Sequence, residues 1–414
     1  MFGNRDSALV SWWHDATPAA RRALVAASLG WLLDSFDVNL YALVLPALMA
    51  GLHLDQTASG SIQSSMLIAA AVGGLAFGVI ADRYGRTRAL MWSVLLYSIF
   101  TAACGLAATA VELAVFRVLL GLGMGGEWAS GAALVAETWP DRLRGRALGV
   151  MQSAWAIGFM LAAVVNWLVL DVAGLDWRAV FFVGVAPALL TLWIRRGVDE
   201  PALWHAARRA PRVPLARAIG GRRASLTAAL ALMNACTLFA YWGFNTWVPS
   251  FLKDAPAAGG IGLSNATMSA FIFVNNIGMW FGYVTFGVIA DAVGRRRTYV
   301  AYLLLAAGFV LVYTSTRNPW ALLALGPVTS FFATGHFSGF GAVTAELYPT
   351  GVRATAQGFT YNIGRIVSAA APAVAGSVAK AHGYAAALSI AAAAFVLAAM
   401  LWAFIPETSR ALPE

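Results

Sequence analysis

The sequence is poor in charge and almost free of cysteine. Only 11% of its 414 residues are Asp, Glu, Lys or Arg, whereas a soluble protein of this size needs far more charge to cover its surface. The two cysteines, Cys104 and Cys236, lie in different apolar runs, which argues against a disulfide framework or a cysteine metal cluster. The polar segments between the apolar runs are too short to form a soluble catalytic domain. These shortages argue against an enzyme.

Apolar residues make up 60% of the chain, and they are gathered in runs of about 20 residues. Hydrocarbon satisfies no backbone hydrogen bonds, so such runs must be membrane-spanning helices. The sequence therefore predicts an all-α membrane protein with twelve transmembrane helices in two six-helix bundles. The predicted bundles cover residues 1–194 and 225–414, joined by a polar central loop, 195–224. The predicted spans are roughly 23–49, 58–81, 89–108, 113–137, 147–170, 179–196, 225–253, 265–290, 298–315, 320–345, 356–380 and 385–405.

The net charge of +9 is unevenly distributed between the two predicted sides of the membrane. Most basic residues fall in the termini, the central loop and alternate short loops. This is the positive-inside bias, which places both termini in the cytoplasm. The basic excess thus reflects topology, and we expect contact with the lipid bilayer of the inner (plasma) membrane and no binding of nucleic acid.

An internal repeat links the two halves. The segment from Phe77 to Arg86 returns, largely unchanged, from Phe286 to Arg295, 209 residues later. The same shift relates Glu137 to Glu346, and Arg144 to Arg353. Two signatures in one register are improbable by chance. In an apolar chain, parallel halves of this size predict a two-bundle transporter.

The repeated segments resemble a signature of the major facilitator superfamily. The first reads Gly78-x-x-x-Asp82-Arg83-x-Gly85-Arg86, and the second Gly287-x-x-x-Asp291-x-x-Gly294-Arg295. Helix 4 adds Arg117-x-x-x-Gly121-x-Gly123-x-Gly125. The resemblance covers the whole chain and implies that loop charges form a cytoplasmic gate. The implied gate residues are Asp82, Arg86, Glu137, Arg144, Asp291, Arg295, Glu346 and Arg353; charge capping of helix ends is a structural reading that overlaps with this role.

Three further stretches resemble the organic-acid/proton symporters within that superfamily. They are Asp34-Ser-Phe-Asp37 in helix 1, Gly126-Glu127-Trp128 in helix 4 and Tyr361-Asn362-Ile-Gly364-Arg365 in helix 11. The similarity is greatest to the sialate/lactate branch and smaller to the aromatic-acid branch. It implies that helices 1, 4, 7 and 10 line a central cavity.

Charged residues inside spanning helices are costly and therefore candidates for function. With a rise of about 1.5 Å per residue, Asp34, Asp37, Glu127, His336 and Arg365 all fall near the bilayer midplane. Asp34 and Asp37 are three residues apart and share a helix face. Depth and face together predict one aqueous pocket between the halves.

Each of these residues has a functional and a structural interpretation. Arg365 suits a substrate anchor because its guanidinium binds a carboxylate through two hydrogen bonds, although it could instead pair with an acid to join the bundles. Asp34, Asp37 and Glu127 are candidate proton carriers, because burial favours the protonated carboxyl and a nearby arginine the charged one. They could equally be structural partners of Arg117.

The sequence gives weaker support to the remaining candidate residues. Arg117 lies closer to the outer face and reaches a helix 1 acid only by extending inward. His336 occupies in the second half the position of Glu127 in the first, which suits a proton relay but also a buried core histidine. Possible polar contacts to substrate come from Tyr241, Asn276, Tyr361 and Asn362.

The sequence thus predicts a proton-coupled symporter of small organic anions, such as lactate-like or aromatic monocarboxylates. We expect a monomer with no cofactor, driven by the proton gradient. The alternative is a proton-coupled exporter of metabolites or drugs, for which the intramembrane arginines make cationic substrates less suitable. A sensor or an intramembrane enzyme ranks lower, because the sequence lacks a zinc-ligand helix motif and a serine nucleophile turn.

Overall fold

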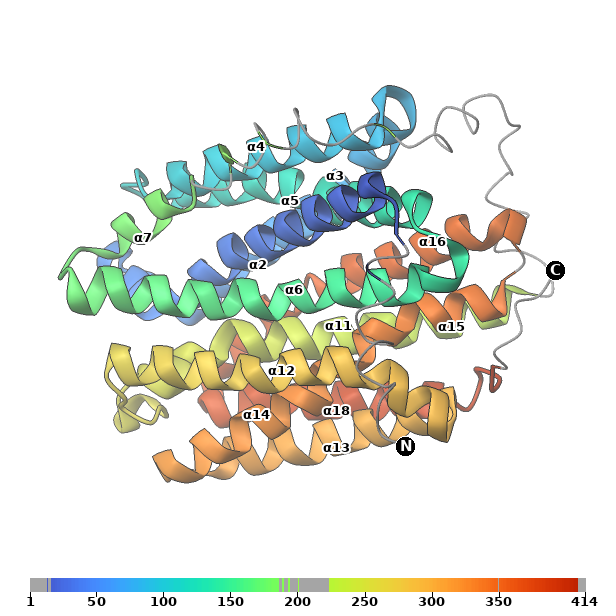
Figure 1. Ribbon diagram of the computed structural model, residues 1–414. Coiled ribbons are helices and arrows are strands. Elements are labelled where there is room, and N and C mark those ends of the chain that lie inside the picture. Colours follow the sequence, from blue (N-terminus) through green and yellow to red (C-terminus); the bar gives the residue numbers. More distant parts are fainter. Residues whose placement is uncertain are drawn as a thin grey trace, which may run out of the picture.

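The protein is helical throughout the part of the chain that the computed structural model describes, residues 13, 16–185, 188–189, 193, 200, 223–348 and 350–408 (Figure 1). Nine helices within those residues are long and apolar enough to cross a membrane. The predicted all-α class is therefore confirmed. Part of the second half of the sixth predicted span, and nearly all of the central loop at 195–224, lie outside the described residues, so the bundle boundaries stay predictions.

The first group of helices, which we call the N-terminal bundle, runs from α2 to α7. Threonine or aspartate caps several of these helices: Asp55 accepts a hydrogen bond from the Ala58 amide at 2.7 Å, and Thr17 one from the Ala20 amide at 3.1 Å. Such caps satisfy the free amides of a first turn. The helices are α2 (Pro18–Leu52), α3 (Gln56–Tyr84), α4 (Arg86–Cys104), α5 (Ala110–Thr138), α6 (Asp141–Trp167), its π-helical extension η1 (Leu168–Val172) and α7 (Trp177–Val183).

The second group, the C-terminal bundle, runs from α11 to α18. Its elements are α11 (Ala224–Lys253), η3 (Pro256–Ala258), α12 (Asn265–Val293), α13 (Arg295–Ser315), α14 (Pro319–Gly335), η4 (His336–Gly339), α15 (Phe340–Leu347), α16 (Thr350–Ser368), α17 (Ala371–His382) and α18 (Tyr384–Leu401).

Two runs predicted as single spans are interrupted. The run at 320–345 is α14 and α15 separated by the 3₁₀ turn η4, where Gly335 and Gly339 lower the helix propensity. The run at 356–380 is α16 and α17, because Pro372 has no amide hydrogen and so favours the start of a new helix. Sequence periodicity alone could not separate a broken span from a continuous one.

The two repeated motifs lie at one end of the molecule, which we call the motif end; the opposite end is the far end. Gly85 and Gly294 form the turns there, with φ angles of +120° and +109°. A side chain is strained at such angles, so glycine is required at both turns. Each turn leads directly into the next helix, α4 or α13, which begins with the motif arginine.

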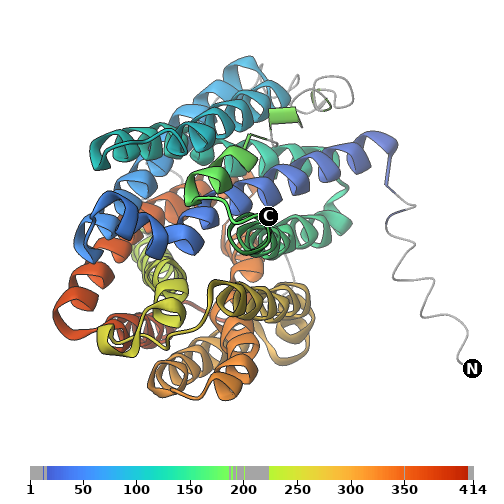
Figure 2. The same ribbon diagram turned by 90° about the vertical axis from the view of Figure 1, so that its left-hand side faces the viewer.

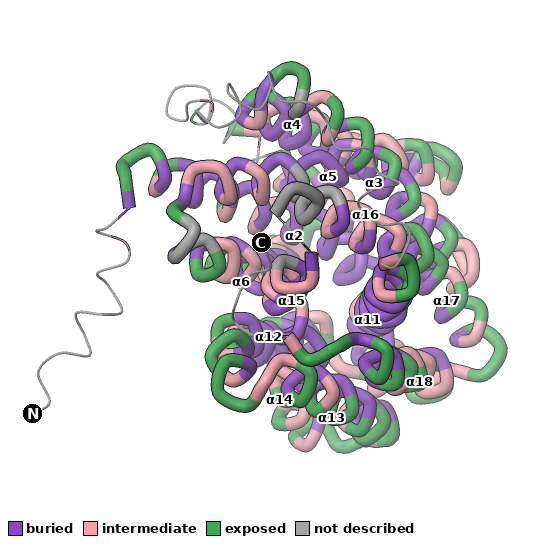
Figure 3. The backbone as a smooth tube through the Cα atoms, turned by 90° about the vertical axis from the view of Figure 1, so that its right-hand side faces the viewer, coloured by how far each residue is buried: buried purple, intermediate pink, exposed green. Residues whose placement is uncertain are grey.

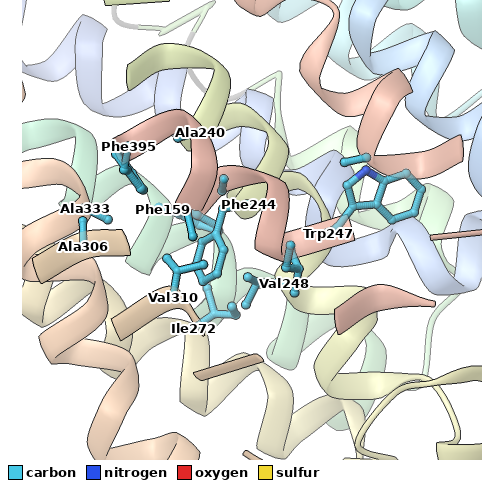
Figure 4. Close-up of a cluster of buried hydrophobic side chains, with 14 of the residues drawn as sticks. Phe159, Ala240, Phe244, Trp247, Val248, Ile272, Ala306, Val310, Ala333 and Phe395 are labelled. Atoms are coloured by element: carbon cyan, nitrogen blue, oxygen red, sulfur yellow. The ribbon is translucent and has the colours of Figure 1, made fainter. Parts of the chain in front are cut away.

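The two bundles pack side by side, with extensive contacts of α12 on α6, α17 on α3 and α11 on α2. Figure 2 shows this arrangement in end view, with α17 (red) next to α3 (blue). A buried apolar cluster continues across the interface, where Phe159 of α6 lies beside Phe244 of α11 (Figure 4). The interface is therefore packed like a protein core on the far-end side of its centre.

The outer surface is apolar as well. On α3, the exposed side chains Ile68, Val72, Leu75 and Val79 form a stripe. Figure 3 shows the general pattern, with exposed segments on the outside of the ring of helices and buried ones within it. Helices that are apolar on their outer face are suited to hydrocarbon.

Candidate functional site

A pocket lies between the two bundles and holds about 950 Å³ of empty space, counted out to its opening. Both bundles contribute to its wall. The N-terminal bundle supplies Trp31, Met124, Ala132, Leu148, Met151, Gln152 and Trp155; the C-terminal bundle supplies Leu238, Tyr241, Trp242, Tyr283, Phe337, Ser338, Phe340, Gly341, Gln357, Tyr361 and Arg365.

Arg365 is the one charged residue on this lining, among the described residues. It lies 15 residues into α16, about 22 Å from the motif end. Its side chain is largely buried, and the guanidinium carbon is 6.0 Å from the centre of the Tyr361 ring. A buried cation facing an otherwise neutral pocket is suited to an anionic ligand.

Asp34 and Glu127 are not part of the pocket lining, but they interact electrostatically with Arg365. Both are fully buried. Within the described residues, Asp34 Oδ2 and both oxygens of Glu127 have no hydrogen-bond partner. Glu127 also depends on Gly30, since a β-carbon there would collide with its Oε1 atom. The structure thus brings together three of the residues that the sequence singled out.

Asp37 and Arg117 lie in a buried cluster outside the pocket lining. Asp37 accepts a hydrogen bond from the Thr101 hydroxyl of α4 at 3.1 Å and interacts electrostatically with Asp34 and with Arg117. Arg117 donates to Gln63 Oε1 and lies 4.4 Å from the centre of the Tyr41 ring. Although Asp34 and Asp37 are three residues apart, they therefore have different partners, and neither Asp37 nor Arg117 lines the pocket.

His336 begins the 3₁₀ turn η4 and points into the C-terminal bundle. Its ring centre is 4.4 Å from that of Phe337 and 6.2 Å from that of Tyr299. Only 2% of the residue is exposed, and neither ring nitrogen has a hydrogen-bond partner in the described part of the chain. Phe337 lines the pocket and His336 does not.

The four predicted polar contacts separate into two groups. Tyr241 and Tyr361 line the pocket, and the Tyr241 hydroxyl accepts a 2.5 Å hydrogen bond from Trp155 Nε1 across the bundle interface. Asn276 and Asn362 are not part of the lining, and their amides donate to backbone carbonyls of their own helices, at 2.8 and 2.9 Å.

At the motif end, equivalent ion pairs form in each bundle. Arg86 lies 3.1 Å from Glu137, and Arg295 lies 3.1 Å from Glu346. Arg295 also pairs with Asp291 at 2.8 Å. Each of these pairs joins helices of a single bundle. The side chains of the other predicted gate residues, Asp82, Arg144 and Arg353, lie outside the described part of the structure.

Two acidic residues at the motif end were missed by the sequence analysis. Glu200 accepts from the amides of Thr87 and Arg88, both at 3.2 Å, and Glu407 accepts from the Arg296 amide at 3.2 Å. Carboxylates are stabilised at helix N-termini by the free amides and the helix dipole. The signal was present in the sequence, because an acid adjoining a proline follows the last helix of each half.

At the far end, polar groups join the two bundles. Lys380 pairs with Asp55 at 2.8 Å. Asn166 donates to the Ser269 hydroxyl at 2.9 Å, and Asn265 donates to Asp171 at 2.6 Å. The bundles are thus bonded together at the far end, whereas the pocket lining extends from Arg365 towards the motif end.

Comparison with known proteins decides the family. The profile of the Major Facilitator Superfamily matches residues 27–257 and 255–414. The chain belongs to this superfamily. The superfamily assignment and the predicted major facilitator fold are therefore confirmed, and the protein is a multi-pass membrane transporter rather than an enzyme.

Relatives and a solved structure agree with this assignment. The chain is 35% identical to a probable 4-methylmuconolactone transporter of Cupriavidus pinatubonensis, over 87% of this chain and 84% of the relative. It is 29% identical to the sialic acid transporter NanX of Escherichia coli, over 93% and 94% of the two chains. The structure of a D-xylose-proton symporter superposes with a TM-score of 0.74 at 20% identity, covering 95% of this chain and 100% of that one.

Within the described residues, no group of three or more His, Cys, Asp or Glu side chains could hold a metal ion. The chemistry that this facilitator can offer a ligand comes from the guanidinium of Arg365, the buried acids that interact with it, and the aromatic and amide groups of the pocket wall.

Proposed function

We propose that this transporter carries small organic monocarboxylates together with protons. The observation that supports this most directly is the position of Arg365 as the one cationic residue on the described pocket lining, with two fully buried acids, Asp34 and Glu127, in its electrostatic field. One relative is named for sialic acid, and a structural neighbour is a proton symporter.

Arg365 links substrate and proton binding in this proposal. In the empty pocket its charge offsets part of the charge on Asp34 and Glu127. A substrate carboxylate binds the guanidinium through two parallel hydrogen bonds and competes with these acids for it. A carboxylate left buried without a partner is strongly disfavoured, so the acid takes up a proton. Binding of the anion therefore promotes binding of the proton.

The two bundles then rearrange around the loaded site. In the conformation described here the far end is held together by the Asp55–Lys380 pair and the Asn166–Ser269 hydrogen bond. The positive-inside bias favours a cytoplasmic motif end, and in this proposal the conformation described above is that of an inward-facing carrier. Opening outward requires the far-end bonds to break.

The test is uptake of labelled benzoate, and separately of labelled lactate, into proteoliposomes with an imposed proton gradient. We expect uptake to collapse with a protonophore and to fall at least about 100-fold in Arg365→Gln, because a planar two-bond contact is lost. Arg317→Gln is the matched control, since Arg317 lies at the far end and contacts the Gly259 carbonyl. Equal uptake by Arg365→Gln and wild type would overturn the proposal. Efflux driven by protons entering in exchange would favour the exporter.

A further inference from the structure

We propose that Gln152 of α6 and Gln357 of α16 form a second subsite within the pocket, and that the substrate is a planar aromatic or conjugated monocarboxylate bearing a hydrogen-bonding substituent. The inference rests on the proposed function, because it takes the carboxylate to bind at Arg365. It adds the shape of the substrate and the residues that recognise its other end.

Eight of the 18 residues that line the pocket are aromatic, and several of their rings hold one another at fixed angles. The Trp31 and Trp155 ring centres are 4.5 Å apart, and Trp155 meets Trp242 edge-on at 6.2 Å. On the other side, Tyr241 meets Phe337 edge-on at 5.7 Å. Rings packed in this way present flat apolar surfaces that suit another flat ring. A polyhydroxylated sugar acid is not flat and would make less contact with these surfaces than a planar ring.

The charges of the site limit the substrate to one carboxylate. Arg365 is the single cation on the described lining. Asp34 and Glu127 interact electrostatically with it and are themselves acidic. A second carboxylate on the ligand would be buried without a cation and would be repelled by the acid that stays ionised. The far side of the ligand must therefore be neutral.

The two glutamines lie on the path from Arg365 to the motif end. Gln357, Tyr361 and Arg365 follow one another at spacings of four residues on α16, so they lie along one face of that helix. Gln152 is equivalent in the repeat to Tyr361. Tyr361 precedes Arg365 by one helical turn, so both positions lie about 6 Å nearer the motif end than Arg365. A ring bound by its carboxylate to Arg365 would extend in this direction.

The amides have the right chemistry for a neutral substituent. Each carries both a donor and an acceptor, so each can bind a hydroxyl, a carbonyl or a ring nitrogen. Gln152 also interacts with the Tyr283 hydroxyl of α12. Gln357 lies next to Gly341, since a β-carbon built on that glycine would be 3.3 Å from Gln357 Nε2. Both glutamines are only partly buried and line the pocket from opposite bundles.

The experiment compares the affinities of purified protein for benzoate, 4-hydroxybenzoate and glucuronate. Wild type should bind 4-hydroxybenzoate about three- to tenfold more tightly than benzoate, the range expected for a net hydrogen bond. Glucuronate should bind more weakly than either. In Gln152→Leu/Gln357→Leu the ratio of the two aromatic affinities should fall to about one. Gln56→Leu at the far end is the matched control and should keep the wild-type ratio.

The two proposals fail in different ways. A ratio that is unchanged in the double variant, or glucuronate binding more tightly than benzoate, would overturn the second subsite while binding still depended on Arg365. If all three acids bind Arg365→Gln as they bind wild type, the proposed function itself fails. Size-exclusion profiles and melting temperatures establish that the compared variants are folded.

Discussion

The two bundles are alike at the motif end and different in the middle. Arg86 and Glu137 pair in the first bundle as Arg295 and Glu346 do in the second, at the same 3.1 Å. At the centre, equivalent positions carry unlike groups. The pairs are Asp34 and Gly243, Asp37 and Thr246, Glu127 and His336, and Ala156 and Arg365.

This difference shows how a duplicated fold acquires an asymmetric site. The ion pairs at the motif end use the same residue types in both bundles, whereas equivalent positions at the centre carry different residue types. At the pocket, the N-terminal bundle supplies Asp34 and Glu127 and the C-terminal bundle supplies Arg365. The electrostatic contact of Arg365 with these two acids therefore exists only where the bundles meet.

The largest expected effect tests the central difference directly. Glu127→Gln removes a buried acid that interacts with Arg365, so accumulation of substrate driven by protons should fall by about 5–150-fold, the range of a typical coupling energy. Exchange of labelled for unlabelled substrate without a gradient should persist, because it needs no net proton transfer. Loss of both activities together would point to a structural role for Glu127.

The equivalent change in the other bundle should act differently. His336→Gln alters a ring that packs on Phe337 away from the pocket, so we expect a loss of stability of about 1 kcal/mol and retained proton coupling. A thermal melt in detergent and the same uptake assay measure the two effects. Loss of coupling equal to that of Glu127→Gln would instead show that His336 belongs to the proton path.

The motif end should respond equally in the two bundles. Arg86→Gln and Arg295→Gln each break a partly buried ion pair, and we expect each to lower uptake about three- to tenfold. Reversing both charges, in Arg86→Glu/Glu137→Arg, should recover part of the loss. A large effect in one bundle alone would contradict the equivalence of the two motifs.

Smaller effects are expected from the acids that cap the motif-end helices. Glu200→Gln removes a full charge from the start of α4, which should cost about 0.3–1 kcal/mol and lower the melting temperature by no more than about 1 °C. Glu407→Gln should do the same or less at α13. If either variant is more stable than wild type, that acid does not stabilise the start of its helix.

The smallest effect is expected at the Asp55–Lys380 pair, which is exposed to solvent. The hydrogen bond from Lys380 lowers the pKa of Asp55, so the carboxylate stays ionised throughout the neutral range and the pair is lost on the acid side only as the pH falls below about 4, the ordinary value for aspartate. Asp55→Asn should therefore change the rate of uptake slightly, without shifting its pH profile in the neutral range. High salt should reduce the difference from wild type. A shifted profile would assign proton coupling to the far end.

Much of the fold could be predicted because apolar runs of spanning length admit only helices, and because the repeat fixed which segments correspond. The pairs Arg86–Glu137 and Arg295–Glu346 join residues that the repeat had already singled out. The broken run at His336 could not be found in this way, since hydropathy does not distinguish a 3₁₀ turn from a continuous helix.

The detailed partners in the site were also beyond the sequence. Depth along a helix placed Asp34 and Asp37 together, but packing turned Asp37 towards Thr101 and Arg117. The sequence did not single out the wall of the pocket formed by α6, with Gln152 and Trp155, because neither residue is charged and the family resemblance implied a cavity lined by helices 1, 4, 7 and 10. Which uncharged residues face a cavity is decided by tertiary packing.

The grouping of one guanidinium with two carboxyls has a consequence for the membrane voltage. When all three groups are ionised they sum to one negative charge, and adding one monoanion and one proton leaves that sum unchanged. A potential of 100 mV is worth about 2.3 kcal/mol for each charge moved across the bilayer. With one proton per anion, the voltage therefore acts equally on the loaded and the returning carrier, and the difference in pH alone sets how far the substrate is concentrated.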